Sequence, residues 1–192
     1  MKNIEFLPEI KMIIDHFYPE DDDLKRTLLK HSCQVCRKAL ELAAKSSETV
    51  DLEIVSGGAM LHDIGIRRCH APGICCTGQL PYLWHGLAGA EMLEQYGIGH
   101  NMDLKVFARI CARHTGSGLT AEEIISGKLP LPAVDLLPET PEEKLVCLAD
   151  KFFSKSGDME EKSFEAVRRS MEKFGAEPLR RFDEMWNYFG FV

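Results

Sequence analysis

The sequence predicts an all-α fold, a single-domain helical bundle. A chain of 192 residues with 45% hydrophobic content can bury one substantial core. Apolar residues recur at helical spacing along most of the chain, and no internal repeat, low-complexity tract or long linker divides it. We therefore expect one domain over residues 1–192, with a functional core over about 24–157 and two further helices within 160–190 packed on that core.

The first part of the chain predicts a short helix followed by a long one. The short helix, over 4–18, ends before Pro19, because proline restricts the residue that precedes it. Acidic residues then open a helix that runs to about Lys45, where negative charge suits the N-terminal dipole. His31 occupies one step of the apolar stripe of this helix and is expected to point inward. A single inward histidine is most often a hydrogen-bonded core residue, so only its partners elsewhere favour a functional role.

A third helix, over about 51–64, delivers the adjacent His62 and Asp63 at its C-terminal end. Gly57 and Gly58 lower its helix propensity but would let another helix approach closely. Gly65 is expected to stop this helix.

The helical period disappears between residues 66 and 83, which predicts a loop over the His-Asp pair. Cys69, His70, Cys75 and Cys76 lie in it and have side chains that can bind metal. A separate metal site is one interpretation, but we favour a loop whose cysteine thiols are reduced and bind no ion. Cys33 and Cys36, three residues apart on the long helix, are similarly interpreted as semi-buried thiols rather than a zinc or redox motif, because no second pair follows.

Two further helices are expected over 84–96 and 103–115. The first presents His85 near its start, where the side chain is either functional or simply solvated. The second carries His114 as the next step of its apolar face, so this imidazole should point into the core.

The last part of the chain predicts four helices. Residues 120–123 and 140–143 both match the capping box, the second with proline at the first helical position, and each opens a helix. The intervening 128–138 is an ordered-looking connection. Amphipathic helices over 160–174 and 178–190 carry aromatic stripes that suit core packing or a dimer contact.

Asp150 lies in the helix that begins after Thr140, among apolar neighbours such as Val146 and Phe153. A carboxylate in such a stretch is rarely left unpaired when buried. It is paired either with an arginine or with a metal ion, and the histidines upstream favour the metal.

The order His … His-Asp … His … His … Asp resembles the HD superfamily of metal-dependent phosphohydrolases. The strongest local motifs are Leu61-His62-Asp63-Ile64-Gly65, Arg113-His114-Thr115-Gly116 and Leu148-Ala149-Asp150-Lys151. The resemblance covers about residues 31–155 and implies a helical bundle of the HD-domain type.

The resemblance also implies the ligands of one or two divalent transition-metal ions. One ion would be held by His31, His62, Asp63 and Asp150, and a second by His85 and His114 with Asp63 bridging. This nitrogen-rich set suits Fe, Mn, Zn, Co or Ni rather than Mg or Ca. In such a centre Asp63 orients a metal-activated hydroxide for in-line attack on phosphorus.

The implied substrate is a nucleotide, a dinucleoside polyphosphate or another small phosphoester. Arg67 and Lys151 are the cationic residues expected to bind its phosphate, with plain surface charge as the alternative. The sequence departs from many family members at Ile66, where they carry lysine. Either an arginine replaces that contact or the substrate differs.

Two other functions remain open at this point. The same six-residue pattern occurs in HD-type mixed-valent di-iron oxygenases, which cleave carbon bonds with oxygen. A non-catalytic binding module that keeps metal for structure is also conceivable, although structural sites usually close with four ligands and need no second ion.

Charge and hydropathy limit the partners. The net charge of −7 and a pI of about 5.5, without a basic run, argue against binding to a nucleic-acid polymer. The sequence has no signal-peptide pattern and no apolar stretch that could span a membrane, and its odd number of cysteines, seven, does not suggest a disulfide framework. We expect a cytoplasmic protein with reduced thiols that can form a homodimer.

Overall fold

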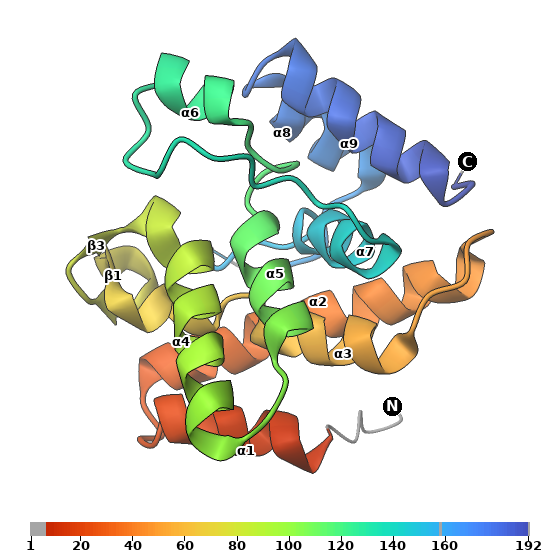
Figure 1. Ribbon diagram of the computed structural model, residues 1–192. Coiled ribbons are helices and arrows are strands. Elements are labelled where there is room, and N and C mark those ends of the chain that lie inside the picture. The colour runs from red at the N-terminus through yellow and green to blue at the C-terminus, as the bar shows by residue number, and fades with distance from the viewer. Residues whose placement is uncertain (1–6, 158, 192) are drawn as a thin grey trace.

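Helices make up most of the structure, a computed structural model that describes residues 7–157 and 159–191. Helical residues account for 64% and strand residues for 5% (Figure 1). The α-helices are α1 Pro8–Phe17, α2 Asp23–Lys45, α3 Leu52–Leu61, α4 His85–His100, α5 Lys105–Arg113, α6 Ala121–Ser126, α7 Pro141–Asp150, α8 Phe164–Glu172 and α9 Ala176–Tyr188. Three 3₁₀ turns are η1 Ile64–Arg68, η2 Pro72–Ile74 and η3 Tyr82–Trp84. Residues 4–6, the start of the predicted first helix, lie outside the described residues.

A small sheet corrects the all-α prediction. The segment expected to be a loop over 66–83 contains β1 Cys69–Ala71, which pairs antiparallel with β2 Cys76–Thr77 and parallel with β3 Leu80–Pro81. These strands have two or three residues each, so they are too short to show the alternation that identifies a strand in a sequence.

The helix α3 lies at the centre of the bundle, in contact with α1, α2, α5 and α7. Its two glycines provide the predicted close approach. A Cβ atom at Gly57 would lie 2.8 Å from the Phe107 ring, and one at Gly58 would lie 2.4 Å from Cδ1 of Ile110. Both neighbours belong to α5, so the backbone of α3 approaches that helix as closely as residues without side chains allow.

Gly65 has a different role from the predicted one. The helix α3 ends at Leu61, and the chain continues through His62 and Asp63 into η1. A Cβ atom at Gly65 would lie 2.1 Å from the carbonyl oxygen of His85 and 2.3 Å from the amide nitrogen of Gly89. Gly65 is therefore required because η1 packs directly against the backbone of α4.

Both predicted capping boxes are present. The Thr120 side chain accepts from the amide of Glu123 while the Glu123 side chain accepts from the amide of Thr120, and Thr140 and Glu143 do the same at α7. These caps fix the start of α7 and hence the place of its last residue, Asp150.

One hydrophobic core joins the N-terminal and C-terminal helices. It includes Ile13 of α1, Val35 of α2, Val146 of α7 and Phe182 of α9, all fully buried. In Figure 1, α8 and α9 lie together at the end of the bundle beside α7. No helix in 7–157 or 159–191 is long and apolar enough to cross a membrane.

Candidate metal centre

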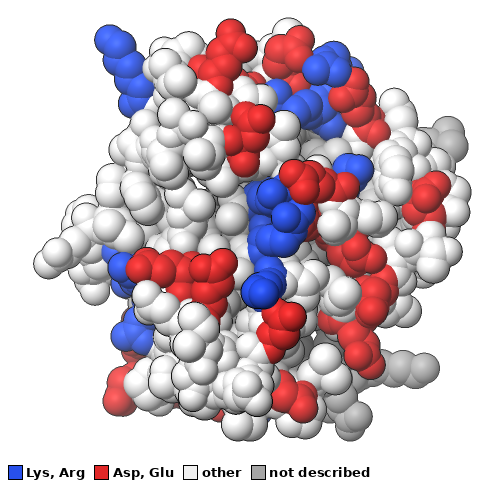
Figure 2. Space-filling view, in the orientation of Figure 1, with Lys and Arg blue, Asp and Glu red and all other residues white. Residues whose placement is uncertain are grey.

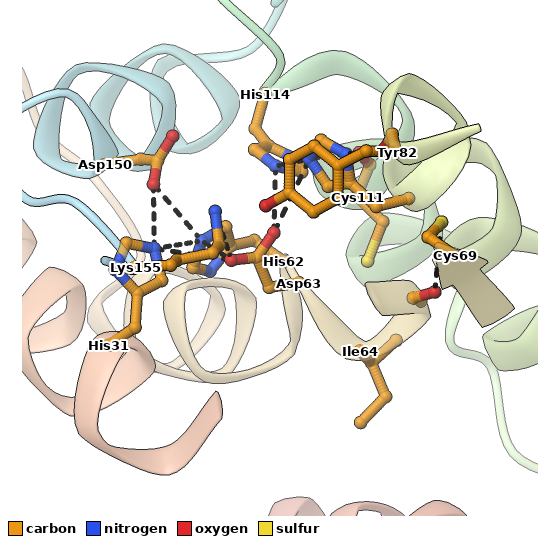
Figure 3. A network of polar contacts seen from close by, with 12 residues as sticks. His31, His62, Asp63, Ile64, Cys69, Tyr82, Cys111, His114, Asp150 and Lys155 are labelled. Atoms are coloured by element: carbon orange, nitrogen blue, oxygen red, sulfur yellow. Dashed lines mark hydrogen bonds and ion pairs between the residues drawn. The ribbon is translucent and has the colours of Figure 1, made fainter. Parts of the chain in front are cut away.

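The six residues of the His/Asp pattern come together in the middle of the bundle (Figure 3). Each is supplied by a different position on the helices: one from within α2, two directly after α3, one at the first residue of α4, one directly after α5 and one at the last residue of α7. All are buried, with at most 7% of any residue exposed. These six are His31, His62, Asp63, His85, His114 and Asp150.

Their ligand atoms form two groups that share Asp63. The first metal group is His31, His62, Asp63 and Asp150, and the second metal group is Asp63, His85 and His114; within each group the potential ligand atoms lie within 4.8 Å of one another. Such spacing lets one ion contact all members of a group after small side-chain shifts.

Asp63 divides its two oxygens between the groups. Oδ2 lies 3.3 Å from Nε2 of His31 and 3.2 Å from Nε2 of His62, whereas Oδ1 lies 3.5 Å from Nε2 of His85 and 3.4 Å from Nε2 of His114. A carboxylate placed in this way has one oxygen available for each of two ions.

The two imidazoles of the second metal group point their Nε2 atoms at each other, where a cation could bind both. Nδ1 of His85 lies 2.7 Å from the carbonyl oxygen of Tyr82, and Nδ1 of His114 lies 2.7 Å from that of Cys111. Carbonyl oxygens only accept, so each Nδ1 carries the proton and each Nε2 has a free lone pair. The two Nε2 atoms nevertheless face each other at 3.0 Å. Two lone pairs at that distance repel unless a positive charge lies close to both.

The pKa values of the four imidazoles shift in different directions. Burial lowers the pKa of His85 to about 3 and also lowers that of His114, so both imidazoles are neutral, as metal ligands must be. Burial also acts to lower the pKa of His62, but the carboxylates of Asp63 and Asp150 more than offset it and raise the pKa to about 9. His62 is thus the imidazole that the carboxylates favour in its charged form, whereas burial lowers the pKa of His31, the other imidazole of the first metal group.

Lys155 is a site residue that sequence reasoning missed. Its ammonium group lies 2.7 Å from Oδ2 of Asp63, and its side chain is 14% exposed. Burial acts to lower the pKa of Lys155, but Asp63 and Asp150 raise it overall. The chain reverses after α7 and brings Lys155 back over Asp63, and the apolar pattern gave no signal of that reversal.

Tyr82 was also missed, because it lies in the segment that was expected to be a loop. Its ring stacks on that of His85 with centroids 4.8 Å apart, and Nζ of Lys155 lies 5.9 Å from the ring centroid. In Figure 3 the Tyr82 ring is drawn beside His114, with its oxygen on the side of Asp63 and Lys155. Burial raises the pKa of Tyr82, so its hydroxyl keeps its proton as a donor.

The two cations predicted to bind phosphate lie in different places. Nζ of Lys151 lies 2.5 Å from Oδ2 of Asp150 and donates to the carbonyl oxygen of His114, so it borders both groups. Arg67 is exposed, and its guanidinium stacks over the ring of Tyr18 at 5.3 Å from the centroid. The structure brings Lys151 to the cluster but turns Arg67 away from it.

The cysteines lie around the cluster as free thiols, and Cys111 and Cys147 are buried close to it. Sγ of Cys111 contacts the carbonyl oxygen of Leu61 at 3.1 Å, and Sγ of Cys147 contacts that of His114 at 3.5 Å. Burial raises the pKa of both thiols, so they remain protonated and pack as small apolar residues. In the predicted loop, Cys69 and Cys76 are buried in the sheet, whereas Cys75 is exposed.

A cavity of about 600 Å³ opens beside the cluster and gives a small molecule access to it. Asp150, Lys151, Lys155 and Tyr82 line the end at the cluster. The other walls come from the sheet segment, the turn after α7 and the helix α8, and they include Ile74, Phe153, Met171 and Phe174.

Such a helical bundle with a buried, shared His/Asp cluster defines a protein built to hold divalent metal. Comparison with known families agrees with this class. The HD domain family model matches residues 28–154, which contain all six cluster residues, and this chain belongs to the HD domain family.

Three curated relatives are similar to this chain. An uncharacterized protein of Methanocaldococcus jannaschii is 38% identical over 126 residues, which are 64% of each chain. A tRNA (cytidine(56)-2'-O)-methyltransferase of Picrophilus torridus is 34% identical over 80% of this chain but 38% of its own length. The protein of the same name from Thermoplasma volcanium is 31% identical over 80% of this chain and 39% of its own length. This chain therefore spans less than two thirds of each of these relatives.

Proposed function

We propose that the protein is a metal-dependent phosphohydrolase that acts on a nucleotide or another small phosphoester. The observation that carries this proposal is the pair of Nε2 lone pairs of His85 and His114, 3.0 Å apart beside Oδ1 of Asp63. A second cation site next to a four-ligand site distinguishes a dinuclear catalytic centre from a closed structural one.

In this proposal some residues of the chain would bind the metal ions and others would bind the phosphate. Bound divalent ions would supply Lewis-acid activation of water and neutralise phosphate charge. His31, His62 and Asp150 would hold one ion, His85 and His114 would hold the other, and Asp63 would be shared. Lys151 and Lys155 offer ammonium groups to phosphate oxygens at the mouth of the cluster.

The cavity supports a small substrate rather than a polymer. Its volume of about 600 Å³ is typical of a small-molecule pocket. On the face shown in Figure 2, basic side chains stand among acidic ones and do not form a continuous positive track. The tRNA methyltransferase relatives match this chain over less than two fifths of their length, so their names describe much larger chains. We therefore propose small phosphorylated substrates and no nucleic-acid polymer.

Metal content is the first test. Protein purified without a chelating tag should contain close to two transition-metal ions per chain by elemental analysis. His114→Ala should reduce this toward one, because it removes half of the imidazole donors of the second metal group. His70→Ala is the matched control, since His70 is exposed in β1 outside both groups. One ion in the wild type, unchanged by His114→Ala, would refute the dinuclear centre.

Activity then separates the candidate reactions. The expected result is hydrolysis without oxygen, seen as phosphate released from a nucleotide or as nucleotides released from a dinucleoside polyphosphate, which is lost in His114→Ala and kept in His70→Ala. Oxygen uptake with a phosphonate or polyol and no hydrolysis would instead support a di-iron oxygenase. Full metal loading with neither reaction would favour a binding module.

A further inference from the structure

Three lysines line the cavity of about 600 Å³ beside the metal groups, in a protein of net charge −7. They are Lys151, Lys155 and Lys162. Lys151 pairs with Asp150 and Lys155 pairs with Asp63. Lys162 differs from both, because no carboxylate within 4.0 Å pairs with it in the part of the chain that the structure describes.

The backbone fixes Lys162 at the cavity wall. Its amide donates to the carbonyl oxygen of Phe152 at 2.9 Å, which ties the turn after α7 to the segment before α8. Its ammonium group donates to the carbonyl oxygens of Lys151 at 3.3 Å and Phe153 at 3.5 Å. These are long contacts to neutral acceptors, and among the described residues the carboxylate whose charge acts on Lys162 is Asp150, which already pairs with Lys151.

Charge balance indicates what the cavity is built to receive. With ions in both metal groups, the carboxylates of Asp63 and Asp150 are shared between those ions and the two lysines that pair with them. Lys162 adds a third ammonium group to the same cavity. A phosphomonoester carries at most two negative charges, whereas a diphosphate monoester carries up to three and therefore balances more of the positive charge of the ions and the lysines.

We propose that the substrate contains at least two linked phosphoryl groups, and that Lys162 binds the one next to the group attacked at the metal centre. This inference rests on the proposed phosphohydrolase function and narrows its substrate to phosphoric anhydrides. The rest of the substrate would then contact the apolar wall formed by Ile74, Phe153 and Phe174. Such a wall favours an uncharged group, for example a nucleoside.

This binding residue belongs to the C-terminal part of the chain. Lys162 lies eight residues beyond the last position matched by the HD domain family model, residue 154. The six cluster residues lie within the residues matched by the HD domain family model. In this proposal the cluster therefore carries the chemistry common to the family, and the segment after Phe153 selects the substrate.

Binding of unreactive probes tests this assignment without requiring turnover. Methylenediphosphonate and methylphosphonate differ by one phosphoryl group, and calorimetry would measure their dissociation constants for the metal-loaded wild type, Lys162→Met and Lys162→Arg. Lys162→Met should weaken the diphosphonate by roughly tenfold or more and methylphosphonate by less than twofold, because one charge-assisted contact is lost. Lys162→Arg should keep most of the wild-type preference, which excludes a merely structural effect.

Two controls complete the experiment. Lys45→Met removes an exposed lysine at the end of α2, outside the cavity, and should change neither constant. Elemental analysis after each titration shows whether the diphosphonate has removed metal. Equal weakening of both probes, or no weakening, would overturn the assignment of Lys162. Selective weakening in a protein that hydrolyses phosphomonoesters but no anhydride would leave the assignment of Lys162 standing and refute the anhydride substrate, whereas hydrolysis of neither would refute the proposed hydrolase.

Discussion

The two metal groups differ in their potential ligands. The first metal group combines two imidazoles with two carboxylates from α2, α7 and the end of α3, whereas the second combines two imidazoles with the shared Asp63. The first group is rich in negative charge. The second depends on neutral donors at the ends of α4 and α5, so charge alone contributes less to its affinity for a cation.

The groups also differ in how firmly their imidazoles are oriented. In the second metal group the backbone holds Nδ1 of both His85 and His114. In the first, Nδ1 of His62 donates to the carbonyl oxygen of Ala59, but the buried Nδ1 of His31 has no partner among the described residues. The first group thus relies on charge and the second on preorganised geometry. This difference suggests that each can be disabled by a different kind of change.

Asp63→Asn should have the largest effect, because it weakens both groups at once. The amide keeps the shape but loses the charge, and it leaves the buried ammonium group of Lys155 without its partner. We expect metal content to fall from two toward none and hydrolysis to fall by roughly 100-fold or more. Elemental analysis and phosphate release would measure this.

Asp183→Asn is the control for Asp63→Asn. Asp183 pairs with Arg168 between α8 and α9, away from the cluster, so its loss should leave metal content unchanged. Retention of both ions by Asp63→Asn would show that the groups do not depend on a shared carboxylate.

The sequence predicted the cluster better than its surroundings, for a physical reason. His31, His114 and Asp150 stand at steps of apolar helical stripes, and a helical period read from one segment reports which way a side chain points. The capping box at Thr140 likewise depends only on local spacing. The direction of a helical side chain and the start of a helix therefore depend on residues that are only a few positions apart in the sequence.

What sequence reasoning missed depends on distant contacts. Lys155 reaches Asp63 only because the chain reverses after α7, and Gly65 is needed only because η1 lies against the backbone of α4. Arg67 follows the motif in sequence, but the 3₁₀ turn η1 directs it outward onto Tyr18. Local spacing carries no information on these approaches.

Gly65→Ala should disable the second metal group selectively. The added Cβ would lie 2.1 Å from the carbonyl oxygen of His85, the first residue of α4, so η1 and α4 must separate. We expect a loss of about 1–3 kcal/mol in the free energy of unfolding from this overpacking. Elemental analysis should show one ion retained and one lost, since α2 and α7 do not move.

Gly73→Ala provides the matched control in the neighbouring segment. A Cβ atom at Gly73 meets nothing within 4 Å, so its substitution should leave both ions and the stability close to wild type. Equal loss of both ions in Gly65→Ala would mean that the groups cannot be uncoupled by geometry.

His62 of the first metal group and His85 of the second should give opposite pH responses in the metal-free protein. The folded pKa of His62, about 9, exceeds the ordinary value of 6.5, so its contribution to stability is complete below 6.5 and is lost as the pH rises through 9. The folded pKa of His85, about 3, lies below 6.5, so stability is lost as the pH falls from 6.5 toward 3. Urea unfolding of chelated protein should therefore be most resistant near pH 6.5, and each titrating histidine should contribute a slope of up to about 1.4 kcal/mol in the free energy of unfolding per pH unit.

Substitutions of His62 and His85 test how much each of these residues contributes to the pH dependence of the free energy of unfolding. His62→Gln should flatten the alkaline side and leave the acid side, because glutamine does not titrate. His85→Gln should make the acid side shallower without abolishing it, since burial also lowers the pKa values of His31 and His114. An alkaline slope that persists in His62→Gln would place the excess negative charge outside the first metal group. The contrast between a charged and a preorganised half of the centre would then not hold.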